Sequence, residues 1–269
     1  MNLKKLIKNI LFKNGYHLMR KFYYDFDGNE SIRKILKLAK RSPSDLTIID
    51  VGANIGQSVD RFREISDTAK IISFEPNPEA FALLKLKKSH DKNLECYNFG
   101  IGSIDGILKF NLQPDSGSSS FKKLNVNSNA FKSSNTKEAK KNHNITTLKK
   151  KIDFNTEINI EVKSLNSVFK NNIPEQIDIL KIDTQGYEEE VLRGASNILQ
   201  NTLIIETEII FANHYVNQAT FKGIEEILSS YGFYLWDIPY IGKFPDEAVN
   251  RVNFIDALFV NKSLLESNK

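Results

Sequence analysis

The sequence predicts an α/β protein organised around a doubly wound, mostly parallel sheet. Short aliphatic segments of strand length alternate with segments of helical periodicity along most of the chain. The strand-like segments are apolar almost throughout, as expected for parallel strands that helices cover on both faces. With 269 residues and 41% hydrophobic composition, the chain is long enough to bury one large core.

The first half of the chain supplies three strands and two helices in alternation. We expect strands at TIIDV, KIISFEP and LECYNFG, which begin at residues 47, 70 and 94. Helices are expected over 57–64 and 78–88, and the second has Pro78 at its start, where proline is tolerated. The next segment, 101–112, is predicted to form a β-hairpin that turns at Asp105-Gly106, because such dipeptides favour tight turns.

The alternation resumes after a long polar segment. Residues 113–157 are rich in Ser, Asn and Lys, and we expect a loop there that contains at most one short helix. The strands INIEVKS, IDILKID, TLIIETE, GFYLWDI and IDALFVN follow, with helices over 188–199 and 221–231. The chain shows no internal repeat and no convincing linker. We therefore expect an N-terminal helical extension over 1–45 and one α/β domain over 46–261, with 113–157 as a loop insertion.

The N-terminal extension contains two predicted helices. Apolar residues recur at helical spacing between lysines within residues 1–12, which predicts an amphipathic helix. Such a helix either packs on its own domain or lies on a membrane surface, and packing on the domain is the commoner outcome. A second helix is expected over 31–40.

The positive charge of the chain is concentrated in two segments. Residues 1–21 hold six basic residues and no acid, and residues 121–157 hold nine Lys against three acids, which is +6 in each case. The whole chain carries +4, so the remainder carries −8 once these two segments, +12 together, are removed. An acidic domain disfavours a nucleic-acid groove, because phosphate neutralisation supplies most of the affinity for nucleic acid.

The remaining compositional features predict a reduced, intracellular protein. The single cysteine, Cys96, excludes an intramolecular disulfide and a Cys-rich zinc site, and its place in a strand-like segment is typical of a small core hydrophobe. The sequence contains neither an apolar run of about 20 residues nor the pattern of a signal peptide. We therefore expect a cytoplasmic location.

The segment DVGANIGQ, from Asp50 to Gln57, has the pattern of a strand, a glycine turn and a helix. It lacks the second and third glycines of the dinucleotide fingerprint and the Gly-Lys-Ser/Thr of a P-loop, so a pyrophosphate ligand is disfavoured. Glu75 ends the next strand, where a carboxylate can accept hydrogen bonds from a ribose diol. A ligand with a ribose, a cationic centre and no phosphate fits this pattern, and S-adenosylmethionine is such a ligand. Taken singly, the glycines could serve only a tight turn and Glu75 could be a solvated strand end.

Four segments together resemble the FkbM-type S-adenosylmethionine-dependent methyltransferases. They are IIDVGANIGQS, ISFEPNPEAFALLK, ILKIDTQGYEEEVLRGA and LIIETE, and the resemblance covers about residues 46–260. It implies a seven-stranded class I methyltransferase sheet whose last strand is antiparallel, and methyl transfer to oxygen on sugars, glycans or related small molecules. The chain differs from the family at Asn166, where an Asp is usual, and in the length of the polar segment before it.

The resemblance also assigns a cofactor site. By similarity, the cofactor is lined by Asp50, Gly52, Asn54, Gly56 and Glu75, and the adenine pocket is edged by Gly100, Ile101 and Gly102.

Transfer of a methyl group to an alcohol requires a base within hydrogen-bond reach of the hydroxyl. The candidate catalytic residues, all near the ends of strands expected to meet one crevice, are Asp183, Glu188, Glu206 and His214. Asp183 is the strongest candidate, because a carboxylate that follows an apolar strand needs a compensating contact. Glu188 could instead complement a helix dipole, and His214 could be an exposed loop residue. A metal held by Asp183, Glu206 and His214 would be an alternative, but their spacing does not support one, and we predict no metal site.

The sequence therefore favours an O-methyltransferase that acts on a hydroxyl of a glycan, a sugar or a related small molecule. One alternative is a catalytically inactive binding module with the same fold, which the intact set of Asp50, Glu75 and Asp183 disfavours. A second alternative is an RNA methyltransferase. The acidic domain argues against it, as does the absence of an Asn/Asp-Pro-Pro-Tyr type of motif.

Overall fold

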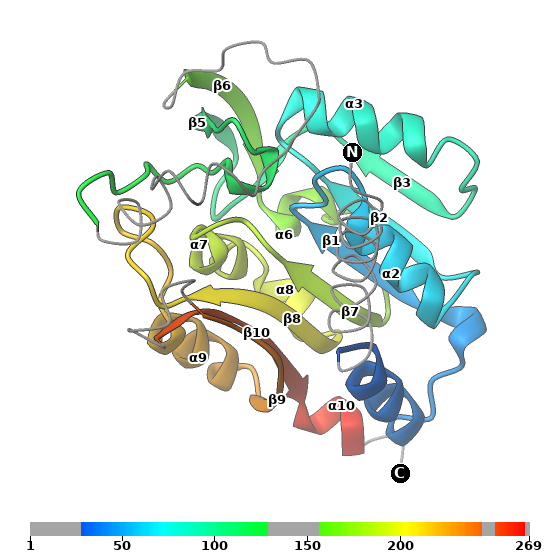
Figure 1. The fold of residues 1–269 in the computed structure, drawn as a ribbon. Coiled ribbons are helices and arrows are strands. Elements are labelled where there is room, and N and C mark those ends of the chain that lie inside the picture. Colours follow the sequence, from blue (N-terminus) through cyan, green and yellow to red (C-terminus); the bar gives the residue numbers. More distant parts are fainter. Residues whose placement is uncertain (1–27, 129–155, 244–250, 267–269) are drawn as a thin grey trace, which may run out of the picture.

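The computed structural model describes residues 28–128, 156–243 and 251–266, and shows an α/β fold built on two sheets (Figure 1). The large sheet has seven strands in the order β3-β2-β1-β7-β8-β10-β9, and the small sheet has three in the order β4-β6-β5. The strands of the large sheet are β1 (Thr47–Val51), β2 (Lys70–Phe74), β3 (Leu94–Tyr97), β7 (Ile177–Ile182), β8 (Thr202–Ile210), β9 (Phe233–Lys243) and β10 (Val252–Asn261). Those of the small sheet are β4 (Gly100–Ile101), β5 (Gly106–Leu112) and β6 (Thr156–Lys163).

The helices lie on both faces of the large sheet (Figure 1). The helical residues 28–38 come first in the described chain. The later helices are α2 (Gln57–Ile65), α3 (Pro78–Lys87), α6 (Leu165–Val168), α7 (Glu188–Arg193), α8 (Ser196–Leu199), α9 (Phe221–Ser230) and α10 (Lys262–Glu266). Two short 3₁₀ helices are η1 (Pro43–Asp45) and η2 (Ser116–Ser118).

The pairing of the large sheet confirms the predicted fold class. Strands β3, β2, β1, β7 and β8 are mutually parallel, and β10, the last strand along the chain, is antiparallel to β8 and β9. From β1 the chain continues through β2 to β3 at one edge of the sheet. The later strand β7 pairs with the other side of β1, and β8, β10 and β9 follow it towards the opposite edge. This reversal of strand order opens a crevice beyond the carboxyl ends of β1 and its neighbours, where ligands of doubly wound sheets bind.

The alternation of side chains along the strands divides the core into two layers. Ile48 faces the helical residues 28–38 and helices α2, α3 and α10, whereas Ile49 and Val51 face α7, α8 and α9. The central strand β7 is buried on both faces, as expected for a parallel strand between two helical layers. These two layers hold the ends of β1 and β7 in a fixed relation.

The predicted hairpin over 101–112 is wrong. Strands β4 and β5 do not pair with each other; β6 lies between them, parallel to β4 and antiparallel to β5. Strand β6 comes from a segment more than forty residues further along the chain, so the local turn dipeptide could not indicate it. The other strands and helices predicted within the described residues are present, and β9 and β10 extend beyond their expected bounds.

The predicted helix over 188–199 is interrupted at Gly194, where it divides into α7 and α8. A Cβ atom at Gly194 would lie 2.0 Å from the carbonyl oxygen of Gly102, so the backbone of the small-sheet segment passes directly against this position. The two segments can approach this closely only because residue 194 has no side chain. The residues that follow β4 therefore pack directly against the break between α7 and α8.

Several predictions fall on residues that the structure does not describe. They include the amphipathic helix within residues 1–12 and the part of the polar segment over 129–155. Among the described residues, no helix is both long enough and apolar enough to cross a bilayer.

We expect Gly194→Ala to lower the free energy of unfolding by about 1–3 kcal/mol, the usual cost of forcing extra atoms into a packed site. Gly106→Ala is the matched control, because a Cβ atom at Gly106 would meet nothing within 4 Å. Urea unfolding of both variants measures the difference. Equal stability of the two variants would contradict the close packing at Gly194.

Candidate active site

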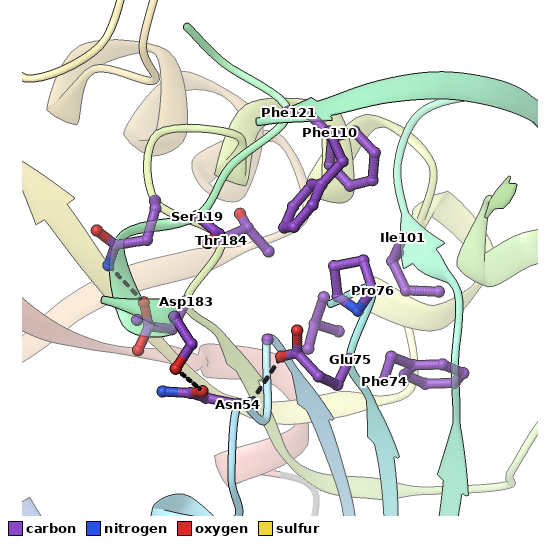
Figure 2. A pocket seen from close by; sticks show the side chains of 15 residues that line it. Asn54, Phe74, Glu75, Pro76, Ile101, Phe110, Ser119, Phe121, Asp183 and Thr184 are labelled. Carbon is purple, nitrogen blue, oxygen red and sulfur yellow. Dashed lines mark hydrogen bonds between the residues drawn. The ribbon is translucent and has the colours of Figure 1, made fainter. Parts of the chain in front are cut away.

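A pocket opens at the carboxyl ends of β1, β2 and β7 (Figure 2). Its base is formed by the turn after β1, by Glu75 at the end of β2, and by Asp183 at the end of β7. The other side is formed by residues of β5 and of the segment that follows it. The lining residues are Val51, Gly52, Asn54, Phe74, Glu75, Pro76, Ile101, Phe110, Ser116, Gly117, Ser119, Phe121, Asp183, Thr184 and Gln185.

The glycine turn brings the ends of β1 and β7 together. Gly52 has φ +85°, a left-handed conformation that favours glycine, and a Cβ atom there would lie 1.9 Å from the carbonyl oxygen of Asp183. The Asp183 backbone N–H donates to the Val51 carbonyl at 3.0 Å, which fixes the two strand ends in register. The predicted role of Gly52 in the turn therefore has a direct physical cause. Gly56, also left-handed, is the residue before α2 and lies against α3 rather than in the pocket.

Glu75 lies inside the pocket with only 6% of its surface exposed. Its two carboxylate oxygens each accept a backbone N–H, from Asn54 and from Asn77, at 2.7 Å in both cases. Burial raises the pKa of Glu75 to about 7, and the two backbone donors offset this only in part. The glycine turn and Glu75 are thus joined directly, as Figure 2 shows for Asn54 and Glu75.

The walls of the pocket are apolar and aromatic. Phe74 and Ile101 lie at one side, and Phe110 and Phe121 contact each other edge-on at 4.8 Å between ring centroids (Figure 2). Gly100 makes room for this arrangement, since a Cβ atom there would lie 2.4 Å from the Phe121 ring.

Of the adenine-edge residues predicted from the sequence, Ile101 lines the pocket, and Gly100 and Gly102 do not. Gly102 packs against the side chains of Val162 and Tyr187. The two glycines therefore shape the wall from behind, and Ile101 forms its surface.

Asp50 lies beneath the turn and does not line the pocket. It is fully buried, and its Oδ2 atom accepts the Ser58 hydroxyl of α2 at 2.5 Å. The Lys181 ammonium lies 3.6 Å from its Oδ1 atom. Asp50 therefore holds the strand end, the following helix and the neighbouring strand together, and any effect on a cofactor passes through the turn.

Asp183 does line the pocket. Its side chain is 36% exposed, the Lys181 ammonium lies 3.3 Å from Oδ2, and the Gln185 amide donates to Oδ1 at 3.0 Å. A carboxylate with one donor on each oxygen retains lone pairs that can accept a further hydrogen. Among the four predicted catalytic residues, Asp183 alone lines the pocket.

The other three predicted catalytic residues have partners elsewhere. Glu188 is 2% exposed and accepts the backbone N–H groups of Thr184 and Gly186, both at 3.0 Å, so it braces the loop after β7. Glu206 is paired with Arg61 of α2 at 2.6 Å. His214 contacts Asn253 of β10 at 2.7 Å, and burial lowers its pKa. Within the described part of the chain, no three metal-ligating side chains are grouped as an ion would require.

The structure adds residues that the sequence did not indicate. Ser116 donates to the Asn54 side chain at 2.8 Å, and Ser120 donates to the Gln185 carbonyl at 2.8 Å, so the segment 113–121 crosses the pocket. Gln185 also donates to Glu208, at 2.7 Å. Burial and the neighbouring Asp183 raise the pKa of Glu208 well above its usual range. Only Glu208 had a sequence signal, because it lies two residues after Glu206 on the same strand.

Comparison with known proteins places this geometry in a family. Residues 50–235 match the Methyltransferase FkbM domain. The chain belongs to the FkbM methyltransferase family. It is therefore an S-adenosylmethionine-dependent methyltransferase, as the sequence predicted.

The names of two curated relatives specify the methyl transfer further. The chain is 26% identical over 199 residues to the 2-O-methyltransferase NoeI of Sinorhizobium fredii, which covers 74% of this chain and 76% of NoeI. It is 25% identical over 188 residues to the hexuronic acid methyltransferase AglP of Haloferax volcanii, covering 69% of this chain and 64% of AglP. Among solved structures, fibrillarin of Methanococcus jannaschii is 15% identical, with a TM-score of 0.44, and the match covers 81% of this chain and 67% of that one.

The pocket residues of this FkbM protein fit the cofactor. S-adenosylmethionine carries a flat adenine, a ribose diol and a cationic methionine end. The walls at Ile101, Phe110 and Phe121 are apolar, and Glu75 offers a carboxylate close to a backbone turn. Asp183 adds a second carboxylate on the opposite side of the base. The ionisable side chains among the described lining residues are the two carboxylates Glu75 and Asp183, so the pocket suits a cationic ligand better than a phosphorylated one.

Buried carboxylates should make the stability of this protein fall as pH rises. Burial raises the pKa of Glu188 to about 7, whereas an unfolded Glu titrates at about 4.3. Between these values the folded state holds the proton and the unfolded state does not, so the free energy of unfolding decreases with increasing pH. Urea unfolding at pH 5, 6, 7 and 8 should show a shallower decrease for Glu188→Gln than for the unmodified chain. Glu225→Gln, on the exposed face of α9, should leave the slope unchanged. Equal slopes for all three proteins would contradict the assignment.

Proposed function

We propose that this FkbM protein transfers a methyl group to a hydroxyl of a sugar, a glycan or a related small molecule. The observation that carries the proposal is the position of Asp183, a carboxylate with free lone pairs in the wall of the cofactor pocket. A hydroxyl is a poor nucleophile until a base accepts its proton, so an O-methyltransferase for alcohols needs a group of this kind. The name of NoeI supports methyl transfer to an oxygen, and the name of AglP, a hexuronic acid methyltransferase, supports a carbohydrate acceptor.

The cofactor, when bound, supplies an activated methyl group on a sulfonium centre. The chain contributes binding, orientation and proton removal. Glu75 would accept the ribose hydroxyls through the lone pairs that Asn54 and Asn77 leave free, and these two backbone donors hold its carboxylate in one orientation. Phe110 and Phe121 cover the apolar part of the pocket and exclude water from it.

Asp183 acts as the base in this proposal. It lies at the end of β7 beside the glycine turn and lines the pocket, so it would be within reach of an acceptor hydroxyl that enters the pocket. The carbon–sulfur bond of the cofactor would break as the carbon–oxygen bond forms, the demethylated cofactor would be the leaving group, and Asp183 would accept the hydroxyl proton. Asp183 is partly exposed, so it can then release the proton to solvent.

The proposal also includes the domain organisation of the chain and its location in the cell. We infer that residues 46–261 form the methyltransferase domain, with residues 1–45 as an extension, and that the enzyme works in the cytoplasm. A role for residues 1–12 at a membrane surface rests on their amphipathic sequence alone.

We expect Glu75→Gln to weaken S-adenosylmethionine binding by about 10- to 100-fold, because a hydrogen bond to a charged group contributes about 1.5–3 kcal/mol. The pKa of Glu75 is about 7, so the affinity of the unmodified protein should rise between pH 6 and pH 8 as the carboxylate loses its proton. In Glu75→Gln this rise should disappear. Isothermal titration calorimetry measures both effects, and Glu79→Gln, at an exposed position of α3, is the control. If Glu75→Gln bound the cofactor with unchanged affinity, Glu75 would not be a cofactor ligand.

Asp183→Asn should reduce methyl transfer by about 100- to 10,000-fold, the usual contribution of a general base, with cofactor affinity changed by less than about threefold. The assay uses isotopically labelled S-adenosylmethionine with a pool of neutral glycosides and detects a mass increase of one methyl group. A parallel loss of cofactor affinity and rate would mean that Asp183 binds the cofactor instead. A variant that is normal in both respects would contradict either role.

A further inference from the structure

Two side chains hold the Asp183 carboxylate. Gln185 lines the pocket, whereas Lys181 does not. Lys181 lies two residues earlier on β7, with its side chain only 12% exposed. Its ammonium is 3.3 Å from Asp183 Oδ2 and 3.6 Å from Asp50 Oδ1. Asp50 and Lys181 are register partners on adjacent parallel strands. One buried cation therefore connects the carboxylate beneath the glycine turn with the carboxylate in the pocket.

The charge of Lys181 is secured by its surroundings. Burial lowers the pKa of this ammonium, but Asp183, Asp50 and Glu206 oppose the effect and raise the pKa above its usual value. These carboxylates favour the charged form of the ammonium. Lys181 thus provides Asp183 with a positive neighbour at 3.3 Å, close to the further carboxylates Glu206 and Glu208.

Gln185 holds the other oxygen of Asp183. Its amide nitrogen donates to Asp183 Oδ1 at 3.0 Å and to Glu208 Oε2 at 2.7 Å. Its amide oxygen accepts the Tyr215 hydroxyl at 3.1 Å. The side chain is thereby fixed at both ends and cannot turn without breaking all three contacts.

The backbone at Gln185 is also unusual. Its φ is +57°, in the left-handed region, where a residue other than glycine costs about 1–3 kcal/mol unless its surroundings enforce it. The Gln185 carbonyl accepts the Ser120 hydroxyl at 2.8 Å, and the amide contacts described above add to this restraint. Such strain is retained where a side chain must point in one direction, which here is towards Asp183.

We propose that Lys181 and Gln185 are positioning residues for Asp183. Lys181 holds one oxygen of the carboxylate in an ion pair at 3.3 Å, and Gln185 donates to the other at 3.0 Å. Together they fix the plane of the carboxylate so that its free lone pairs face the pocket. The inference rests on the proposed function of Asp183 as the base. It extends that function by naming the two residues that orient the base. Glu208 of β8 and Tyr215 contribute indirectly, because both hold the Gln185 side chain.

The competing explanation is that both residues only stabilise the fold. Lys181 could serve as a counter-ion for Asp50, and Gln185 could link neighbouring loops by hydrogen bonds. Loss of stability alone cannot distinguish the two explanations. The position of the Asp183 carboxylate can, because a purely structural role does not require that carboxylate to move when one partner is removed.

The experiment uses Lys181→Met and Gln185→Met, which keep approximate side-chain length and remove the polar contacts. Crystal structures of both variants should show the Asp183 carboxylate rotated or in more than one conformation. Transfer of labelled methyl groups to the glycoside pool should fall by about 10- to 100-fold, the cost of misplacing a reacting group by about 1 Å. S-adenosylmethionine affinity by calorimetry should stay within about threefold. Lys181→Arg retains the cation and should recover part of the lost rate.

Two exposed positions provide matched controls, Lys70→Met on β2 and Gln200→Met after α8. If Lys181→Met does not fold, Gln185→Met carries the same test. An unmoved Asp183 carboxylate together with a rate within about threefold of the unmodified enzyme would overturn the inference. The Asp183→Asn variant separates the role of Asp183 as base from the positioning role of Lys181 and Gln185. If Asp183→Asn is fully active, the proposed function itself fails. If it is inactive and the Met variants are normal, only the positioning role fails.

Discussion

The contact between the ends of β1 and β7 is the constraint on which the site depends. Residue 52 has no side chain, so the Asp183 carbonyl occupies the space that a Cβ atom would fill. The glycine turn and the strand that carries the proposed base are thereby held side by side. The two core layers fix the strands themselves, since β1 and β7 contribute buried residues to both. In the proposed function, cofactor binding and proton removal therefore share this one junction.

The charges around the junction explain why its residues have separate tasks. Four carboxylates interact with the two buried cations Lys181 and Arg61, and they are Asp50, Asp183, Glu206 and Asp256. Glu206 is paired with Arg61, Asp50 is bonded to Ser58, and burial favours the protonated form of Glu208. Asp183 differs from these because it is partly exposed and lines the pocket. Asp50, Glu206 and Glu208 thus have partners in the framework, and Asp183 is the one of these four acids that lines the pocket.

Much of the fold was predictable because its signals are local. Apolar runs of strand length alternating with helical segments identify a parallel sheet, and the glycine turn identifies the strand next to the ligand. The adjacency of β1 and β7 followed from the predicted fold and is confirmed. The hairpin at Asp105-Gly106 failed because the partner of both strands, β6, comes from a distant part of the chain. Likewise, the sequence places Asp50 at a strand end but does not tell which face of the sheet its side chain joins.

The site shows the same division between local and distant information. Glu75 and Asp183 are recognisable because each ends an apolar strand, whereas Ser116 and Phe121 come from a polar segment without periodicity. Glu188 looked like a catalytic candidate because it follows Asp183 closely, yet its carboxylate turns back to the loop before it. Short sequence distance therefore indicated the right region, and only the three-dimensional contacts separate the pocket residues from those that support them.

We propose that the junction of β1, β2 and β7 holds the cofactor with its ribose at Glu75 and its reacting end at Asp183. A crystal structure with S-adenosylhomocysteine, the demethylated product, would test this placement. We expect both ribose hydroxyls within hydrogen-bond distance of the Glu75 carboxylate, the adenine between Ile101 and the Phe110 and Phe121 rings, and the sulfur on the Asp183 side of the glycine turn. A ribose that contacts neither oxygen of Glu75, or a product molecule bound away from this junction, would contradict it.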